Sequence, residues 1–267
     1  MSKLRSHPVG PRLRQAGFSL IELMIGITIG LLVMVAAVGS LVYTRISSTA
    51  VGDSSRLQQD ASTAFRIIGH HIRQGGARRV EQAGGGTVEF NGAFFGFGSA
   101  AAGTVVVTGT DGAANAADTL QISNDRVAPV PVAPAVDPWP TMNRDCLGAP
   151  SRLANSVTNT FSLNAGNLFC VGSGADDGAA LVQGVEDLQV WYGSRNILND
   201  QLIYQASPVP GISNQIDTVM VCLRMAGEAT GNPGANSIGC IPGQDIADDG
   251  RIRRVFFRVF NIRNIGI

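Results

Sequence analysis

An apolar run begins at Phe18 and extends to Val42, and it constrains the fold more than any other feature of the sequence. Its 25 residues contain one charged side chain, the carboxylate of Glu22. As an α-helix the run would be about 37 Å long, enough to cross a hydrocarbon core of about 30 Å. We therefore expect a transmembrane helix over residues 18–42, with the rest of the chain divided between the two sides of a membrane.

The segment in front of this run carries charge of one sign. Four basic residues and no acidic residue precede Gly17, namely Lys3, Arg5, Arg12 and Arg14. Basic flanks stay on the cytoplasmic side, so the chain that follows the apolar run is predicted to be exported. An ordinary secretory signal would have its small cleavage residue after the apolar region, whereas Gly17 lies before it.

Glu22 is an unfavourable residue for a plain membrane anchor. A carboxylate inside the bilayer costs about 2.5–3.5 kcal/mol on insertion scales and usually marks a functional position with a partner. The alternative is that Glu22 lies close enough to the membrane interface to stay hydrated.

The segment Gly17-Phe18-Ser19-Leu20-Ile21-Glu22-Leu23 resembles the class III signal of type IV pilins and type II secretion pseudopilins. This resemblance implies that a membrane-embedded prepilin peptidase cleaves after Gly17 and methylates the new N-terminal residue, Phe18. It also implies that Glu22 offsets the N-terminal charge of a neighbouring subunit during assembly. A buried carboxylate and a buried ammonium each cost several kcal/mol alone and can compensate each other when paired.

Beyond Val42 the helical pattern continues in a more polar form. Apolar residues recur three or four positions apart, at Leu57, Ala61, Phe65, Ile68 and Ile72. This spacing predicts one amphipathic helix that packs against a globular head and ends at Gly75 and Gly76. Unbroken from Ser19 to Gln74 the helix would be about 84 Å long, with residues 47–55 as its weakest part. His70 and His71 are predicted to be ordinary residues near the helix end.

After Arg79 the sequence changes to short β-rich runs that glycines interrupt. The predicted strands are Thr104–Thr108, Asp118–Ser123, Leu168–Gly172, Val182–Tyr192, Ile216–Met225 and Arg251–Ile262. In the fourth, Gln189 and Trp191 alternate with apolar residues, which indicates a half-buried strand. The predicted fold class is α+β, a long N-terminal helix on an antiparallel β head. Its predicted parts are a leader (1–17), a transmembrane half-helix (18–42), an amphipathic half-helix (43–75) and the head (76–267).

Four cysteines all lie in the predicted head, at Cys146, Cys170, Cys222 and Cys240. No pair has zinc-site spacing and no histidine lies near them, so a metal site is not expected. An even number in an exported domain fits two disulfides, for which three connectivities exist. The sequential pairing is preferred because each bridge closes a short loop, with a stabilisation of about 3 kcal/mol each.

Two head segments carry a second, narrower resemblance, to PilW-type minor pilins: residues 184–193 and residues 249–256. Residues 184–193, GVEDLQVWYG, resemble the pattern "GVE-x-L-x-V-x-YG" of that family. Residues 249–256, DGRIRRVF, with the later Arg263-Asn264, look like its C-terminal strand. Together with the leader and the long helix, the resemblance covers most of the chain.

No catalytic constellation can be assembled from the head, because it contains no histidine. Asp176-Asp177-Gly178 and Asp248-Asp249-Gly250 lack the spacing of a calcium loop and are predicted to be turns. A cluster of arginines lies near the end of the chain, at Arg251, Arg253, Arg254, Arg258 and Arg263. Alternation divides them between two strand faces, so we interpret them as edge-strand charges that discourage aggregation. DNA contact is the alternative interpretation. However, the sequence from Phe18 onward contains 16 basic and 20 acidic residues, so it has no overall positive charge.

The function expected from this resemblance is that of a minor pilin, not an enzyme, with no cofactor. It would start or cap type IV pilus assembly and thereby support motility or adhesion. Its partners would be the prepilin peptidase, other minor and major pilins and the inner-membrane assembly machinery. Before assembly it would reside in the inner membrane with its head in the periplasm, and afterwards on the cell surface. A type II secretion pseudopilin and a ligand-binding tip adhesin are the alternatives, and nucleic acid is not an expected partner.

Overall fold

The computed structural model describes most of the chain after the basic leader. The described residues are 17–77, 79–82, 88–91, 106–113, 116–126, 144–153, 156–174, 177–196, 199–207, 216–230, 239–244, 246 and 249–263. They belong to two compact units, residues 1–48 and 49–267. The predicted leader up to residue 16 and the proline-rich segment 129–140 lie outside the described residues.

One helix, α1, extends from Leu20 to Gln74 without a break. At 1.5 Å per residue its 55 residues correspond to about 82 Å. The polar stretch at residues 47–55, expected to be the weakest part, is helical throughout. The helix ends where Gly75 donates its N–H to His71 O and Gly76 takes a positive φ of 71°. A left-handed glycine at this position is a common helix stop.

The described part of the head contains three antiparallel sheets. The smallest pairs β1 (Arg79–Gln82) with β2 (Val88–Asn91). The five-stranded sheet follows chain order through β3 (Val107–Thr108), β4 (Leu120–Asp125), β5 (Ser156–Asn164), β6 (Asn167–Gly172) and β7 (Ala179–Gln183). The four-stranded sheet has the order β11-β10-β8-β9, formed by β11 (Arg253–Asn261), β10 (Ile216–Ala226), β8 (Val185–Arg195) and β9 (Leu202–Gln205). A long apolar helix with antiparallel sheets confirms the predicted α+β class.

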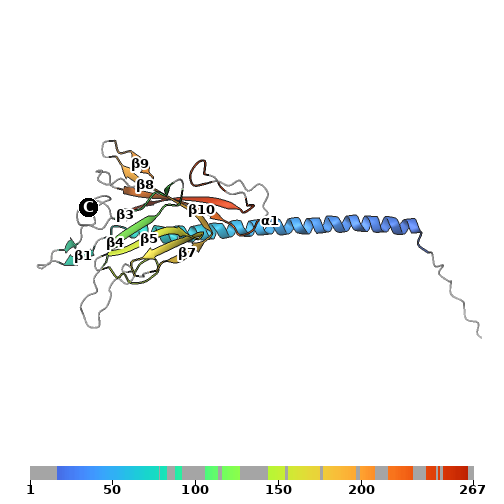
Figure 1. The fold of residues 1–267 in the computed structure, drawn as a ribbon, viewed down its shortest axis with the longest axis horizontal. Helices are drawn as coiled ribbons and strands as arrows, with labels where there is room; N and C mark the ends of the chain where they lie inside the picture. Colours follow the sequence, from blue (N-terminus) through green and yellow to red (C-terminus); the bar gives the residue numbers. More distant parts are fainter. Residues whose placement is uncertain are drawn as a thin grey trace, which may run out of the picture. The chain divides into compact units, whose positions relative to one another are not determined.

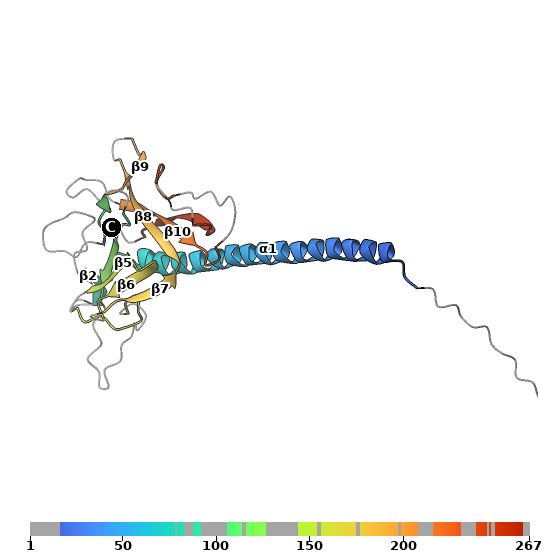
Figure 2. The same cartoon turned by 45° about the vertical axis from the view of Figure 1, so that its right-hand side comes forward.

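The C-terminal part of α1 lies between the two larger sheets of the head (Figures 1 and 2). All five residues of the predicted apolar stripe are buried there, namely Leu57, Ala61, Phe65, Ile68 and Ile72. They form one core cluster with inward-facing side chains of both sheets, among them Phe161 from β5 and Leu223 from β10. The predicted amphipathic face is therefore confirmed.

The strand predictions need several corrections. The run predicted as one strand over Val182–Tyr192 is divided into β7 and β8 at Gly184, whose φ is 74°. A positive φ suits glycine and interrupts the extended backbone, which turns β8 toward a different sheet. Strand β5 was not predicted, because its polar residues at Thr158, Asn159 and Thr160 mask the alternation. The short strands β1, β2 and β9 were not predicted either.

Gly69 lies where α1 packs against β11. A Cβ atom at this position would overlap the ring of Phe260, a buried side chain that also lies 6.2 Å from the Phe65 ring. We expect Gly69→Ala to lower the free energy of unfolding by about 1–3 kcal/mol through overpacking. Urea unfolding monitored by circular dichroism measures this change.

Gly52→Ala is the matched control, because a Cβ at Gly52 meets open space on the same helix. That variant should gain up to about 1 kcal/mol from helix propensity. Equal effects of the two substitutions would contradict the close packing of α1 on β11.

Candidate functional site

The N-terminal segment forms the start of α1. Gly17, Phe18 and Ser19 are not helical, and the Ser19 carbonyl accepts from the N–H groups of Glu22 and Leu23 at 3.0 and 3.1 Å. Ser19 is therefore the N-cap and Glu22 the third residue of the helix. Serine and glutamate at these two positions have the spacing of a capping box. This local role of Ser19 was missed in the sequence, although the Ser-x-x-Glu spacing signals it.

Glu22 also lies in the first turn of α1. The positive end of the helix macrodipole favours a carboxylate there by about 0.3–1 kcal/mol. Glu22 and Phe18 are both exposed, and Phe18 has 84% of its surface accessible. The predicted processing and assembly residues thus lie together on an accessible helix start.

The N-terminal part of α1 displays its apolar side chains on all sides. Large hydrophobic residues from Phe18 to Val51 are exposed, most of them by more than half. This part of the helix is long and apolar enough to cross a membrane. Added Cβ atoms would meet open space at Gly26, Gly30 and Gly39, so packing within the chain does not require these glycines.

Comparison with known families identifies the segment. Residues 12–38 match the family described as "Prokaryotic N-terminal methylation motif". The chain thus carries this motif at the start of its apolar helix. The match begins in the basic leader, includes Gly17, Phe18 and Glu22, and ends within α1. No curated protein sequence matches the chain.

Two solved structures are similar to this chain. A type IV-like pilin from Thermus thermophilus, TTHA1219, has 14% identity and a TM-score of 0.44, covering 79% of this chain and 99% of its own. A chain of the GspK-GspI-GspJ complex from the enterotoxigenic Escherichia coli type 2 secretion system has 12% identity and a TM-score of 0.33. It covers 74% of this chain and 95% of its own.

Two disulfides stabilise the head. They join Cys146 to Cys170 and Cys222 to Cys240, with sequence separations of 24 and 18. This is the sequential pairing preferred from the sequence. The described part of the chain contains no free cysteine.

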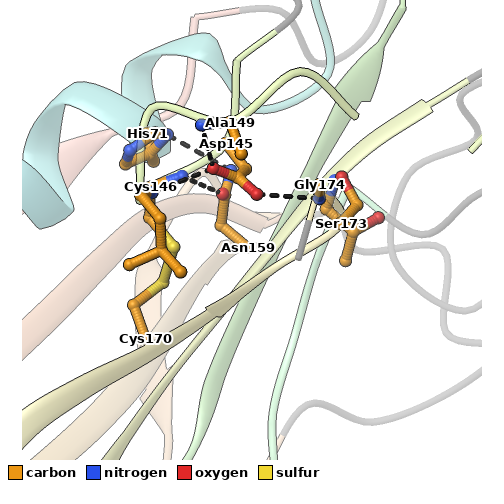
Figure 3. Close-up of a disulfide and its surroundings, with 10 residues drawn as sticks. His71, Asp145, Cys146, Ala149, Asn159, Cys170, Ser173 and Gly174 are labelled. Carbon is orange, nitrogen blue, oxygen red and sulfur yellow. Dashed lines mark hydrogen bonds between the residues drawn. A yellow bond between two sulfur atoms is a disulfide. The ribbon is translucent and has the colours of Figure 1, made fainter. Parts of the chain in front are cut away.

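The first disulfide anchors a turn that the buried carboxylate of Asp145 organises (Figure 3). Asp145 Oδ1 accepts from the N–H groups of Leu147 and Ala149, each at 2.9 Å, and its Oδ2 accepts from Gly174 N–H at 2.7 Å. The carboxylate is thus satisfied by three backbone donors, as buried charge requires. It holds the Cys146 turn against the end of β6.

His71 connects α1 to the same cluster (Figure 3). Asn159 Oδ1 accepts from Cys146 N–H at 2.6 Å, which leaves the Asn159 amide nitrogen to donate to His71 Nδ1 at 3.2 Å. His71 Nδ1 is therefore an acceptor, and the ring is neutral with its proton on Nε2. His71 was predicted to be an ordinary helix-end residue, but it is buried and its ring lies 5.8 Å from that of Phe161.

Stability should depend on pH through His71. Burial, reinforced by the neighbouring charge of His70 and only partly opposed by Asp145, lowers the pKa of His71 to about 4. Unfolded histidine has a pKa near 6.5. The unfolded state binds the extra proton between these values, so the free energy of unfolding is highest above pH 6.5. It should fall by about 1.4 kcal/mol per pH unit as the pH drops toward 4.

The measurement is urea unfolding of the full chain in detergent micelles over this pH range. His71→Gln should flatten the pH dependence by removing the titrating group. His70→Gln, at the exposed neighbouring position, should retain most of it. Unchanged pH dependence in His71→Gln would contradict the prediction.

The second disulfide anchors a segment over the outer face of β8. Gln189 donates to Asp187 Oδ1 at 3.0 Å and to the Ala116 carbonyl at 3.0 Å. Gln244, four residues after Cys240, donates to Asp187 Oδ2 at 2.9 Å. Asp187 and Gln189 are consequently buried. The prediction that β8 is half-buried is wrong, because segments distant in sequence cover its polar face.

The arginines near the chain end divide as predicted. Arg253 is 4% exposed and contacts Glu186 Oε2 and Asp249 Oδ1, each at 2.7 Å. Hydrogen bonding to Arg253 holds the pKa of the Asp249 carboxyl well below its usual range. Arg251 Nη1 also reaches Glu186 Oε1, at 3.3 Å. Arg251 and Arg253 thus form ion pairs with acidic neighbours. Arg254 and Arg258 are instead exposed cations on β11.

Among the described residues, no group of three or more His, Cys, Asp or Glu side chains is arranged to hold a metal ion. Asp176 and Asp248, from the two segments predicted to be turns, lie outside the described residues. The accessible helix start is therefore the feature of the described chain that the comparisons connect to a function.

Proposed function

We propose that this chain is a minor pilin of the PilW type that enters a filament through its N-terminal helix. One observation carries the proposal, the match to the methylation motif over residues 12–38 at the start of an exposed apolar helix. A prepilin peptidase cleaves after Gly17 and methylates Phe18. The chain is a structural subunit and not an enzyme.

Each proposed part of the chain has a role in processing or assembly. Residues 1–17 are the leader, residues 18–42 hold the precursor in the inner membrane, and residues 43–75 support the head, residues 76–267. The head resides in the periplasm until the assembly machinery transfers the subunit into the filament. Two disulfides in the head fit an oxidising compartment.

Glu22 aligns the subunit with its neighbours in this proposal. Its carboxylate is the one charged group among 25 apolar-run residues, and the processed N-terminus of an adjacent minor or major pilin is the cation it pairs with. Pairing removes the cost of two isolated charges in a low-dielectric environment. The same contact would fix the axial position of each helix.

A deletion strain tests the proposal. Loss of surface pili and of twitching motility, restored by the wild-type gene, is the expected result. Loss of secreted enzymes with normal pili would identify a type II secretion pseudopilin instead. Normal pili that fail only in surface attachment would identify a tip adhesin.

A further inference from the structure

Strand β11 is an edge of the four-stranded sheet. Ile262 donates to the Asp217 carbonyl at 2.9 Å, and the Ile252 carbonyl accepts from Gly227 at 2.8 Å. Alternate residues of an antiparallel strand face the same neighbour, so the even-numbered residues of β11 bond to β10. The backbone N–H and C=O groups of Val255, Phe257 and Val259 therefore point away from β10. No other strand of the described chain pairs with them.

One face of this edge is apolar and exposed. Phe257 is 56% exposed and Val259 is 50% exposed. Met220 of β10 lies opposite both Val259 and Trp191, and the Trp191 ring lies 6.4 Å from that of Phe257. These four residues form a continuous patch on the outer side of the sheet. Aromatic and apolar side chains gathered on an exposed surface commonly mark an interaction site.

The other face of the edge is cationic. Arg254 and Arg258 are exposed, and because they are four residues apart they lie on the same side of β11. Neither forms an ion pair with a described residue, in contrast to Arg253. The Arg258 guanidinium lies over the Phe65 ring, 5.6 Å from its centroid. That contact orients the cation and leaves its charge uncompensated.

Pairing with a second copy of this chain would bring like charges together in the central register of β11. In an antiparallel pair of two β11 strands centred on Phe256, Arg254 of each copy would lie opposite Arg258 of the other. Like charges directly opposite each other destabilise a strand pair. In that register the arginines would oppose self-pairing, and the same charges would select for a partner of opposite sign.

We propose that the free edge of β11 binds an extended acidic segment of a partner protein as an additional strand. Its backbone would pair with Val255, Phe257 and Val259, and its carboxylates would lie opposite Arg254 and Arg258. Its alternate apolar side chains would cover the patch of Phe257, Val259, Trp191 and Met220. Main-chain bonds supply affinity and the alternate side chains supply specificity in this mode of recognition. The proposal does not depend on the role assigned to the N-terminal segment.

The test uses the full chain in detergent micelles and a fluorescent synthetic peptide. The peptide has the length of β11 and alternates glutamate with valine, and a lysine–valine peptide of equal length is its counterpart. Fluorescence anisotropy should show saturable binding of the acidic peptide that weakens with added salt. The double variant Arg254→Glu/Arg258→Glu should weaken this binding about tenfold or more and should prefer the lysine peptide. Arg66→Glu, an exposed charge reversal on α1, should bind like the wild type.

A second pair of variants separates strand addition from general charge attraction. Val259→Pro removes a backbone donor of the free edge while retaining the bonds to β10. It should weaken the acidic peptide about tenfold, whereas Val259→Thr, which keeps the N–H and the branched shape, should bind nearly normally. Near-ultraviolet circular dichroism verifies that both variants are folded.

Three results would overturn the proposal. The first is failure of the wild-type chain to bind the acidic peptide, and the second is equal binding of the acidic and lysine peptides. The third is association of the chain with itself that Arg254→Glu/Arg258→Glu weakens, which would identify a second copy as the occupant. None of these results bears on cleavage or filament assembly.

Discussion

Gly17→Ala should leave the entire chain in the membrane as an uncleaved precursor. The proposed peptidase must accept the residue before the cleaved bond, and a side chain there would obstruct its active site. The structure offers no competing reason for a loss of cleavage, because a Cβ at Gly17 meets nothing within 4 Å. Folding of the chain should therefore be unaffected. Intact-mass spectrometry of the membrane fraction measures the retained leader directly.

The same spectrum tests the modification of Phe18. Wild-type protein should begin at Phe18 and carry one additional methyl group, and the Gly17→Ala precursor should carry none. Gly26→Ala is the matched control, because its Cβ also meets open space and lies beyond the cleavage site. That variant should be cleaved and methylated normally. Mature-size protein in Gly17→Ala would contradict the assigned cleavage position.

The features predicted correctly from the sequence depend on short-range patterns. The apolar run and the stripe from Leu57 to Ile72 are periodic along one helix, and periodicity is local information. The sequential disulfide pairing likewise reflects short loops, closed by Cys146–Cys170 and Cys222–Cys240. Each of these features can be evaluated without knowing which distant segments meet.

The features that were missed depend on long-range contacts. Asp187 and Gln189 have the polar alternation of a half-buried strand, yet Gln244 and Ala116 cover them. His71 is kept neutral by burial, and its hydrogen bond comes from Asn159, 88 residues away. Alternation along a strand indicates which face is polar. It does not indicate whether a distant segment covers that face and forms hydrogen bonds with its polar side chains.

The candidate site was predictable to a different degree. Gly17, Phe18 and Glu22 were selected through resemblance to a processing signal, and the motif match covers them. The structure adds Ser19 as the N-cap of α1. Its carbonyl accepts the first hydrogen bonds of the helix, which begins at Leu20. Glu22 therefore lies in the first turn of α1, next to the N-cap. Substitution of Glu22 by Gln and by Asp should consequently affect helix capping and charge pairing differently.

Glu22→Gln should be cleaved normally but should fail to enter filaments, as should Glu22→Ala. Glutamine suits the third position of a capping box as well as glutamate does, so the helix start is retained. It lacks the charge that would compensate a neighbouring ammonium, and an unpaired charge in a low-dielectric contact costs several kcal/mol. Incorporation should therefore fall by more than about tenfold. Immunoblots of sheared pili and of membranes, normalised to each other, measure it.

Glu22→Asp completes the series because it keeps the charge on a shorter side chain. If charge pairing between subunits is the role of Glu22, Asp should retain more assembly than Gln, despite its poorer fit to the capping box. If Glu22 acts only by capping its own helix next to Ser19, Gln should assemble like the wild type and Ala should be the defective variant. The local effect is worth about 0.3–1 kcal/mol, too little for a complete loss of assembly. A wild-type phenotype for Glu22→Gln would thus remove the intersubunit role.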